Sequence, residues 1–258
     1  MSAMIEPCET SVERPVGFFD SGLGGLCILE AFKRECPGES TIYIADSKHC
    51  PYGNRPADEI IRISRENTRR LLERGCKMVV VACNTATAAA IDVLREEFPD
   101  TPFIGLEPAV KPAAIMSRSG VVGVLATAGT FNGRLYRETT ERFAKGVTVI
   151  ASVADEFVTL VERGETSGAH AEEVVSAKVS PLIAAGADYI VLGCTHFPHL
   201  KPLIEKIAAG RATVLDPSDA VARHAKDVLV ARGLAGANVA PTHEFIRTKG
   251  DDDADARN

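Results

Sequence analysis

The hydrophobic positions of the chain fall into short, uninterrupted runs that alternate with longer amphipathic stretches. The runs are rich in β-branched residues, which is typical of parallel strands buried on both faces. The predicted strands are Val16 to Phe19, Thr41 to Ala45, Met78 to Ala82, Phe103 to Gly105, Val121 to Leu125, Val147 to Ala151, Tyr189 to Gly193 and Thr242 to Ile246. Strands that alternate with helices predict an α/β fold with mostly parallel sheets.

The amphipathic stretches predict helices between these strands. After a helix that ends near Cys36, the predicted helices are Ala57 to Arg74, Ala86 to Glu97, Phe131 to Ala144, Asp155 to Glu162, Ala171 to Ala184, Leu200 to Ala209, and a last one capped by Ser218 that runs to about Arg232. Residues 1–13 and 249–258 are polar, and we expect them to be flexible tails.

Two cysteine tripeptides stand at matching places in this pattern. Cys83-Asn84-Thr85 and Cys194-Thr195-His196 each follow a predicted strand and precede a predicted helix. Ligands bind at this edge of open α/β sheets, and the start of a helix favours anions, including thiolates.

The surroundings of the two cysteines also repeat. A glycine stands eight positions before each cysteine, and Gly105-Leu106-Glu107-Pro108 has a counterpart in Val214-Leu215-Asp216-Pro217. The offset between the halves is roughly 110 residues, much longer than a solenoid repeat. The sequence therefore predicts two pseudo-symmetric α/β domains with the active site between them. We place the first domain at 14–108 plus 216–248 and the second at 109–215.

The composition of the chain argues against a nucleic-acid-binding protein and against a membrane-spanning one. The chain has 258 residues and a net charge of −6, which argues against broad nucleic-acid binding. Its apolar runs are shorter than the roughly 18 residues of a membrane span. Seven cysteines without CxxC pairs indicate reduced thiols in a cytoplasmic protein.

The paired cysteines suggest a particular reaction. If the two halves face each other, Cys83 and Cys194 approach one ligand from opposite sides, which suits racemisation or epimerisation of a carbon centre. A thiol with a reference pKa of about 8.5 can both take and give a proton near neutral pH. Asp20 and His196 are candidates to set the protonation of each thiol. The remaining cysteines are interpreted as small buried side chains, namely Cys8, Cys27, Cys36, Cys50 and Cys76.

Three other features of the sequence could indicate a ligand or a cofactor. The turn Asp20-Ser21-Gly22-Leu23-Gly24-Gly25 either lies against a ligand or only joins a strand to a helix, and it does not match a dinucleotide motif. His49 and Cys50 lack nearby partners in the sequence, so no metal site is predicted. Lys48 and Lys111 lie outside any phosphate-binding motif, so pyridoxal phosphate is not expected.

Several motifs, in order, resemble the glutamate racemases of the aspartate/glutamate racemase family. They are Asp20-Ser21-Gly22-Leu23-Gly24-Gly25, Pro51-Tyr52-Gly53, Cys83-Asn84-Thr85-Ala86, Glu107-Pro108-Ala109-Val110-Lys111-Pro112 and Gly193-Cys194-Thr195-His196. The resemblance implies a cofactor-independent enzyme that makes D-glutamate from L-glutamate for peptidoglycan. It also implies a cytoplasmic enzyme, expected as a homodimer, with a small-molecule substrate and no nucleic-acid or membrane partner.

The same resemblance assigns roles to residues. It implies that Cys83 deprotonates D-glutamate with help from Asp20, and that Cys194 deprotonates L-glutamate with help from His196 and Glu162. The residues that would contact substrate are Asp20, Ser21, Pro51, Tyr52, Gly53, Asn84, Thr85, Thr127, Thr130, Thr195 and His196.

The chain departs from the family pattern in two places. It has Val153-Ala154 where relatives usually carry Cys-Pro, close before Glu162, and its C-terminus is shorter than is common. Two alternatives stay open: aspartate racemase, whose members usually show Glu where this chain has His196, and a non-catalytic amino-acid-binding relative.

Overall fold

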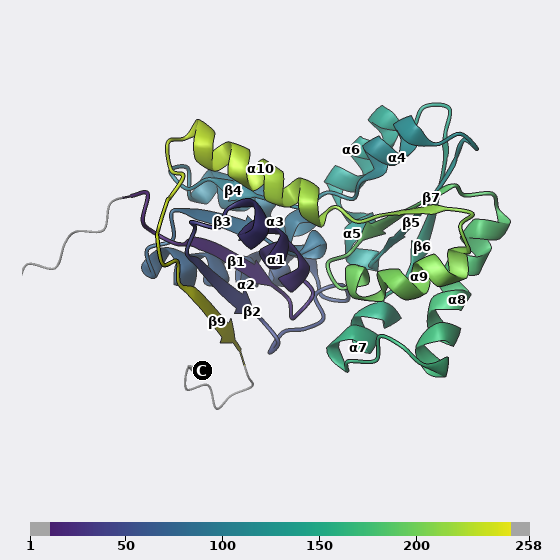
Figure 1. Ribbon diagram of the computed structural model, residues 1–258, viewed down its shortest axis with the longest axis horizontal. Coiled ribbons are helices and arrows are strands. Elements are labelled where there is room, and N and C mark those ends of the chain that lie inside the picture. The colour runs from purple at the N-terminus through teal and green to yellow at the C-terminus, as the bar shows by residue number, and fades with distance from the viewer. Residues whose placement is uncertain (1–10, 249–258) are drawn as a thin grey trace, which may run out of the picture.

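The computed structural model describes residues 11–248, and it contains two parallel β-sheets that lie side by side (Figure 1). The predicted tails at 1–10 and 249–258 lie outside the described residues. The first sheet has the order β4-β3-β1-β2-β9 and the second has the order β6-β5-β7-β8. All of the strand pairs are parallel, so the predicted α/β class is confirmed.

The first sheet consists of β1 (Val16–Asp20), β2 (Thr41–Ala45), β3 (Met78–Val81), β4 (Phe103–Ile104) and β9 (His243–Arg247). Helices cover both faces: α1 (Leu26–Glu35) and α10 (Ser218–Ala231) lie on one, α2 (Ala57–Glu73) and α3 (Asn84–Glu97) on the other. Side chains alternate along β1, so Phe18 packs towards α1 and α10 while Phe19 packs towards α2 and α3. This two-sided burial explains why the strands are apolar without alternation.

The second sheet consists of β5 (Val121–Ala126), β6 (Thr148–Val153), β7 (Tyr189–Gly193) and β8 (Thr213–Leu215). Around it lie α4 (Val110–Met116), α5 (Ala128–Asn132), α6 (Arg134–Phe143), α7 (Glu156–Glu162), α8 (Ala169–Ala184), the 3₁₀ helix η1 (Phe197–Leu200) and α9 (Lys201–Ala208). Its larger core lies between the sheet and helices α7, α8 and α9.

The two sheets share one topology. Read from opposite edges, β4-β3-β1-β2 and β8-β7-β5-β6 have the same order, with β1 matching β5 and β3 matching β7. The chain passes from the first lobe to the second after β4, and returns after β8 to form α10 and β9 (Figure 1). This is the pseudo-symmetry expected from the sequence repeat, while the exact domain boundaries stay a prediction.

Two local predictions were wrong, and one strand was missed. The helix predicted from 131 to 144 is two helices, because Gly133 is extended between α5 and α6 (φ −70, ψ 146). A Cβ on Gly133 would lie 2.5 Å from Ala88 Cβ, so a glycine lets this segment approach α3. The short strand β8 was missed, whereas the helix predicted from Leu200 to Ala209 is confirmed as α9, which η1 precedes. Ser218 is the first residue of α10 and not its cap, and its N–H donates to Asp216. Within residues 11–248, every helix is too short or too polar to cross a membrane.

Candidate active site

The two predicted cysteines occupy equivalent places in the two lobes. Cys83 lies between β3 and α3, and Cys194 directly follows β7. Both are free thiols and both are buried, with 5% and 8% of their surface exposed. The Cys83 sulfur accepts a long hydrogen bond from the Ala86 N–H, 3.5 Å away, at the start of α3. The two thiols are near enough that a charge on Cys194 raises the pKa of Cys83.

The surroundings of Cys83 favour its neutral form. Burial raises the pKa of Cys83 well above its ordinary value, and the negative charge of Asp20 adds to this effect. Cys83 is therefore a protonated thiol at neutral pH, ready to donate.

Asp20 organises the glycine-rich turn after β1. Its Oδ2 accepts hydrogen bonds from the N–H of Gly25 at 2.9 Å and of Gly22 at 3.4 Å. Its Oδ1 accepts from the Thr195 hydroxyl at 3.4 Å, and Thr195 belongs to the second lobe. The carboxylate is fully buried, so its charge acts in a site from which water is largely excluded.

The same turn packs directly against the second lobe. The N–H of Leu23 donates to Glu162 Oε1 at 2.8 Å. A Cβ on Gly24 would lie 2.5 Å from His196 Nδ1 and 2.7 Å from the His196 backbone nitrogen. Glycine is thus required by this close approach, and the turn does more than join a strand to a helix.

His196 stands between Glu162 and Cys194. Its Nε2 lies 2.7 Å from Glu162 Oε1, and its Nδ1 lies 3.8 Å from the Cys194 sulfur. Burial by itself lowers the pKa of His196, but hydrogen bonds with Cys194, Cys50 and Glu162 outweigh burial and hold the pKa well above its ordinary value. The ring is therefore an imidazolium at neutral pH, and it lies beside the Cys194 sulfur.

Glu162 is the ionised partner of this pair. Burial tends to raise the pKa of Glu162, but the hydrogen bonds from His196 and from the Leu23 N–H lower it overall. The unusual Val153-Ala154 segment does not prevent the contact. Ala154 is fully buried in the core between the sheet and α7, and Glu162, the last residue of α7, still reaches His196.

Polar side chains from both lobes meet beside the thiols. The hydroxyl of Thr85 lies 2.9 Å from that of Thr127, which lies 3.0 Å from that of Thr130. Thr85 comes from α3, Thr127 caps the start of α5 and Thr130 lies within α5, so this chain of hydroxyls crosses between the lobes. The Asn84 amide nitrogen is buried and has no hydrogen-bond partner among residues 11–248. An unpaired buried donor costs about 1–3 kcal/mol, so its retention points to a bound acceptor.

The loop that contains Pro51, Tyr52 and Gly53 is held by a residue that the sequence analysis missed. Asp46, directly after β2 and almost fully buried, accepts hydrogen bonds from the Tyr52 hydroxyl at 2.6 Å and from the Thr248 hydroxyl at 2.8 Å. The Tyr52 hydroxyl is thus directed at Asp46.

The remaining predicted residues lie around this loop and turn. Gly53 backs onto Thr127, where a Cβ would meet the threonine Cβ at 3.1 Å. Ser21 is buried in the glycine turn, whereas Pro51 is exposed. The signal that could have revealed Asp46 is its position, because it follows β2 as Asp20 ends β1.

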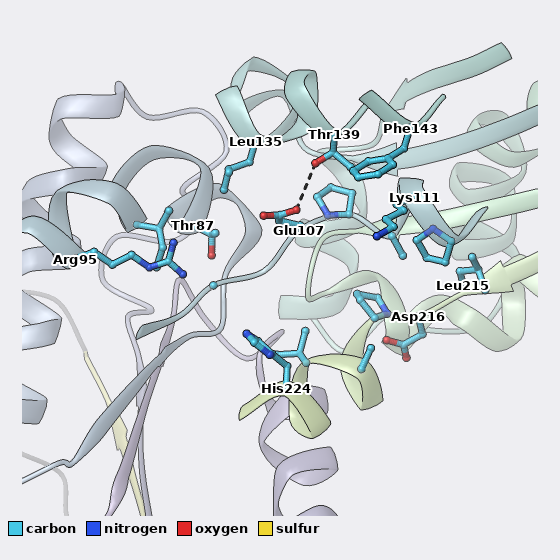
Figure 2. A pocket seen from close by; sticks show the side chains of 18 residues that line it. Thr87, Arg95, Glu107, Lys111, Leu135, Thr139, Phe143, Leu215, Asp216 and His224 are labelled. Atoms are coloured by element: carbon cyan, nitrogen blue, oxygen red, sulfur yellow. Dashed lines mark hydrogen bonds between the residues drawn. The ribbon is translucent and has the colours of Figure 1, made fainter. Parts of the chain in front are cut away.

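A separate cavity of about 520 Å³ lies where the two connections between the lobes pass each other (Figure 2). It is lined mainly by α3, α6, α10 and the segments around Glu107 and Asp216. Figure 2 shows Glu107 and Thr139 facing each other on one side of this cavity, with His224 on another side. Neither Cys83 nor Cys194 lines it, so it is distinct from the site of the thiols.

Comparison with known proteins gives one consistent result. Residues 27–225 match the family model described as Asp/Glu/hydantoin racemase. The chain is 46% identical over 221 residues to a protein named glutamate racemase from Roseiflexus sp. (strain RS-1), which covers 86% of this chain and 81% of that protein.

Solved structures agree in fold. A glutamate racemase isoform from Bacillus anthracis superposes with a TM-score of 0.83 at 30% identity, covering 93% of this chain and 90% of that one. A glutamate racemase from Francisella tularensis, solved in complex with D-glutamate, superposes with a TM-score of 0.81 at 29% identity, covering 92% and 89%.

Proposed function

The chain belongs to the Asp/Glu/hydantoin racemase family, and we propose that it is a glutamate racemase that interconverts L- and D-glutamate with two cysteines. One observation carries the mechanism: two buried thiols at equivalent strand ends have opposite electrostatic surroundings. Cys83 lies beside the carboxylate of Asp20 and is kept protonated, and Cys194 lies beside the imidazolium of His196. One sulfur is thus suited to give a proton while the other takes one.

Conversion of L-glutamate begins at Cys194. Its thiolate removes the proton from Cα, and the electron pair of the C–H bond stays on Cα and spreads into the α-carboxylate. The thiol of Cys83 then gives its proton to the opposite face of Cα. The products are D-glutamate, a Cys194 thiol and a Cys83 thiolate, and D-glutamate reacts by the same steps in reverse.

The developing negative charge on the substrate needs fixed hydrogen-bond donors. Asn84 supplies a buried amide N–H that lacks a partner in the described part of the chain, and we propose that a substrate carboxylate oxygen accepts from it. We propose that the hydroxyls of Ser21, Thr85 and Thr195, together with the Thr127–Thr130 pair and the Pro51-Tyr52-Gly53 loop, hold the rest of the substrate. Since the Tyr52 hydroxyl is directed at Asp46, this loop contributes through its backbone.

The choice of glutamate over aspartate rests on His196 after the second Cys-Thr and on the names of the relatives. From the family resemblance we further propose a cytoplasmic homodimer whose product, D-glutamate, enters peptidoglycan. Sedimentation of the full chain tests the dimer.

The decisive experiment is racemisation in D₂O, started from each enantiomer of glutamate and of aspartate. The wild type is expected to incorporate deuterium at Cα of inverted glutamate and to leave aspartate unchanged. Cys83→Ser and Cys194→Ser are each expected to lose about 10²–10⁴-fold in racemisation, because serine is a far weaker acid.

The two variants are also expected to differ in exchange. Cys83→Ser retains Cys194 and should still exchange the Cα proton of L-glutamate, while Cys194→Ser should exchange that of D-glutamate. Full racemisation by either variant would remove that cysteine from the mechanism, and inversion of aspartate alone would favour the aspartate alternative.

A further inference from the structure

Cys50, Glu162 and His196 form a cluster of metal-ligand side chains where the two lobes meet. One ligand atom from each residue lies within 4.8 Å of the other two. Cys50 comes from the loop after β2 in the first lobe, while Glu162 ends α7 and His196 follows β7 in the second. These partners of Cys50 cannot be recognised from the sequence, because both are more than 100 positions away in the chain.

The donor types match one class of ion. A thiolate, an imidazole and a carboxylate are the ligands of zinc, whereas calcium and magnesium bind through oxygen. Zinc bonds of about 2.0–2.3 Å in a tetrahedral arrangement place ligand atoms roughly 3.3–3.8 Å apart. Ligand atoms that lie up to 4.8 Å apart therefore need to approach one another by about 1.5 Å at most to hold zinc, a movement that side-chain rotation supplies.

The cluster is also accessible to a hydrated ion, and one of its oxygen atoms accepts no hydrogen bond within the described residues. The hydrogen bonds that Glu162 accepts within the described residues fall on Oε1, from Leu23 and His196, which leaves Oε2 for a cation. The Glu162 side chain is 18% exposed and Cys50 is half-buried, so a hydrated ion has a route to the site. The substrate-binding groups proposed above do not include Cys50, whose thiol lies beside His196.

We propose that Cys50, Glu162 and His196 bind a zinc ion and that this binding reversibly inhibits the enzyme. The ion occupies a ring nitrogen of His196, so the ring is held by the ion and is not free to assist Cys194, 3.8 Å away. Because the ligands come from both lobes, the bound ion also ties the lobes together and hinders entry of substrate. The inhibition rests on the proposed racemase function, whereas the binding itself does not.

The test compares three full-length proteins: the wild type, Cys50→Ser, and Cys36→Ser as a matched control. Cys36 caps the C-terminal end of α1 and lies outside the cluster. Zinc binding is measured by competition with a chromophoric chelator, and thiolate ligation by the near-ultraviolet sulfur-to-cobalt band after addition of Co²⁺. We expect one zinc ion per chain, weakened about tenfold or more by Cys50→Ser and unchanged by Cys36→Ser.

Racemisation is measured on the same proteins with and without zinc chloride. Each protein is compared with its own metal-free rate, and we expect Cys50→Ser to need about tenfold more zinc than the wild type for half-inhibition. Zinc binding or a cobalt band that Cys50→Ser leaves unchanged would overturn the site. Cys50-dependent binding without inhibition of an active racemase would overturn the inhibition. If none of the three proteins racemises glutamate, the proposed function fails, and the chelator and cobalt measurements still decide the metal site.

Discussion

Replacing Glu162 with glutamine removes one negative charge from the site with little change in shape. Glu162 Oε1 accepts hydrogen bonds from His196 Nε2 at 2.7 Å and from the Leu23 N–H at 2.8 Å. The glutamine carbonyl can still accept from Leu23, so the glycine turn keeps its contact. What is lost is the charge opposite a His196 side chain that is only 2% exposed.

The expected loss follows from the type of hydrogen bond. A hydrogen bond to a charged group contributes about 1.5–3 kcal/mol. At 1.36 kcal/mol per factor of ten, a loss of about 2 kcal/mol lowers kcat/KM roughly 30-fold. Because the two enantiomers have equal free energy, kcat/KM must fall by the same factor for L- and D-glutamate, although kcat and KM can change separately.

The pH dependence gives a second readout. Glu162 is one of the groups that raise the pKa of His196, so the Gln variant lowers that pKa. Activity that needs the imidazolium is present below this pKa and is lost as pH rises through it. The alkaline limb of the kcat/KM profile is therefore expected to move to lower pH in the variant. Polarimetry of both enantiomers across the pH range measures it.

The free energy of unfolding of the Glu162→Gln variant should also depend on pH through His196. The pKa of His196 is higher in the folded chain than in the unfolded one. Its protonation therefore stabilises the fold fully below the unfolded value, and this contribution is lost as pH rises through the folded value. Glu162→Gln should thus cost more free energy of unfolding at acidic than at alkaline pH. A variant with an unmoved alkaline limb and a loss below about threefold would refute the proposed role of the ion pair.

Three further substitutions test the site. Asp46→Asn weakens the hold on the Tyr52 hydroxyl, and we expect steady-state kinetics to show KM for glutamate raised about tenfold, with kcat less affected. Asn84→Ala removes a donor that has no partner among the described residues, so KM for glutamate should rise about tenfold. Urea denaturation should show a loss below about 1 kcal/mol in the free energy of unfolding, and a larger loss would mean that Asn84 serves the fold. Gly24→Ala introduces a Cβ against His196, and activity should fall about 10²-fold; near-normal activity would show that the contact is loose.

The sequence was sufficient for the features that depend on local pattern. Apolar runs identified the strands other than the short β8, and their carboxyl ends identified the edge where Cys83 and Cys194 lie. The one long-range feature that it revealed, the repeated topology, was visible because duplication leaves similar residues at a constant offset. The break at Gly133 was missed because the preceding and following residues continue a helical pattern, although Asn132-Gly133 is a common turn dipeptide.

Contacts between the lobes could not be predicted in this way. The approach of Gly24 to His196, and of Cys50 to Glu162, depends on how two separately folded sheets face each other. No periodicity in the chain encodes that orientation. Glu162 was found through family resemblance alone, since a single glutamate at the end of a helix has the pattern of a solvent-exposed residue.

Burial of both sulfur atoms has a consequence for successive turnovers. In the proposed reaction, an enzyme that has just released D-glutamate carries its proton on Cys194, whereas one that has released L-glutamate carries it on Cys83. Water reaches either sulfur poorly, since they are 5% and 8% exposed. The free protein thus retains, for a short time, the protonation state left by the enantiomer it last released. At high substrate concentration, we expect proton exchange between these two states of the free enzyme, and not bond breaking at Cα, to limit the rate.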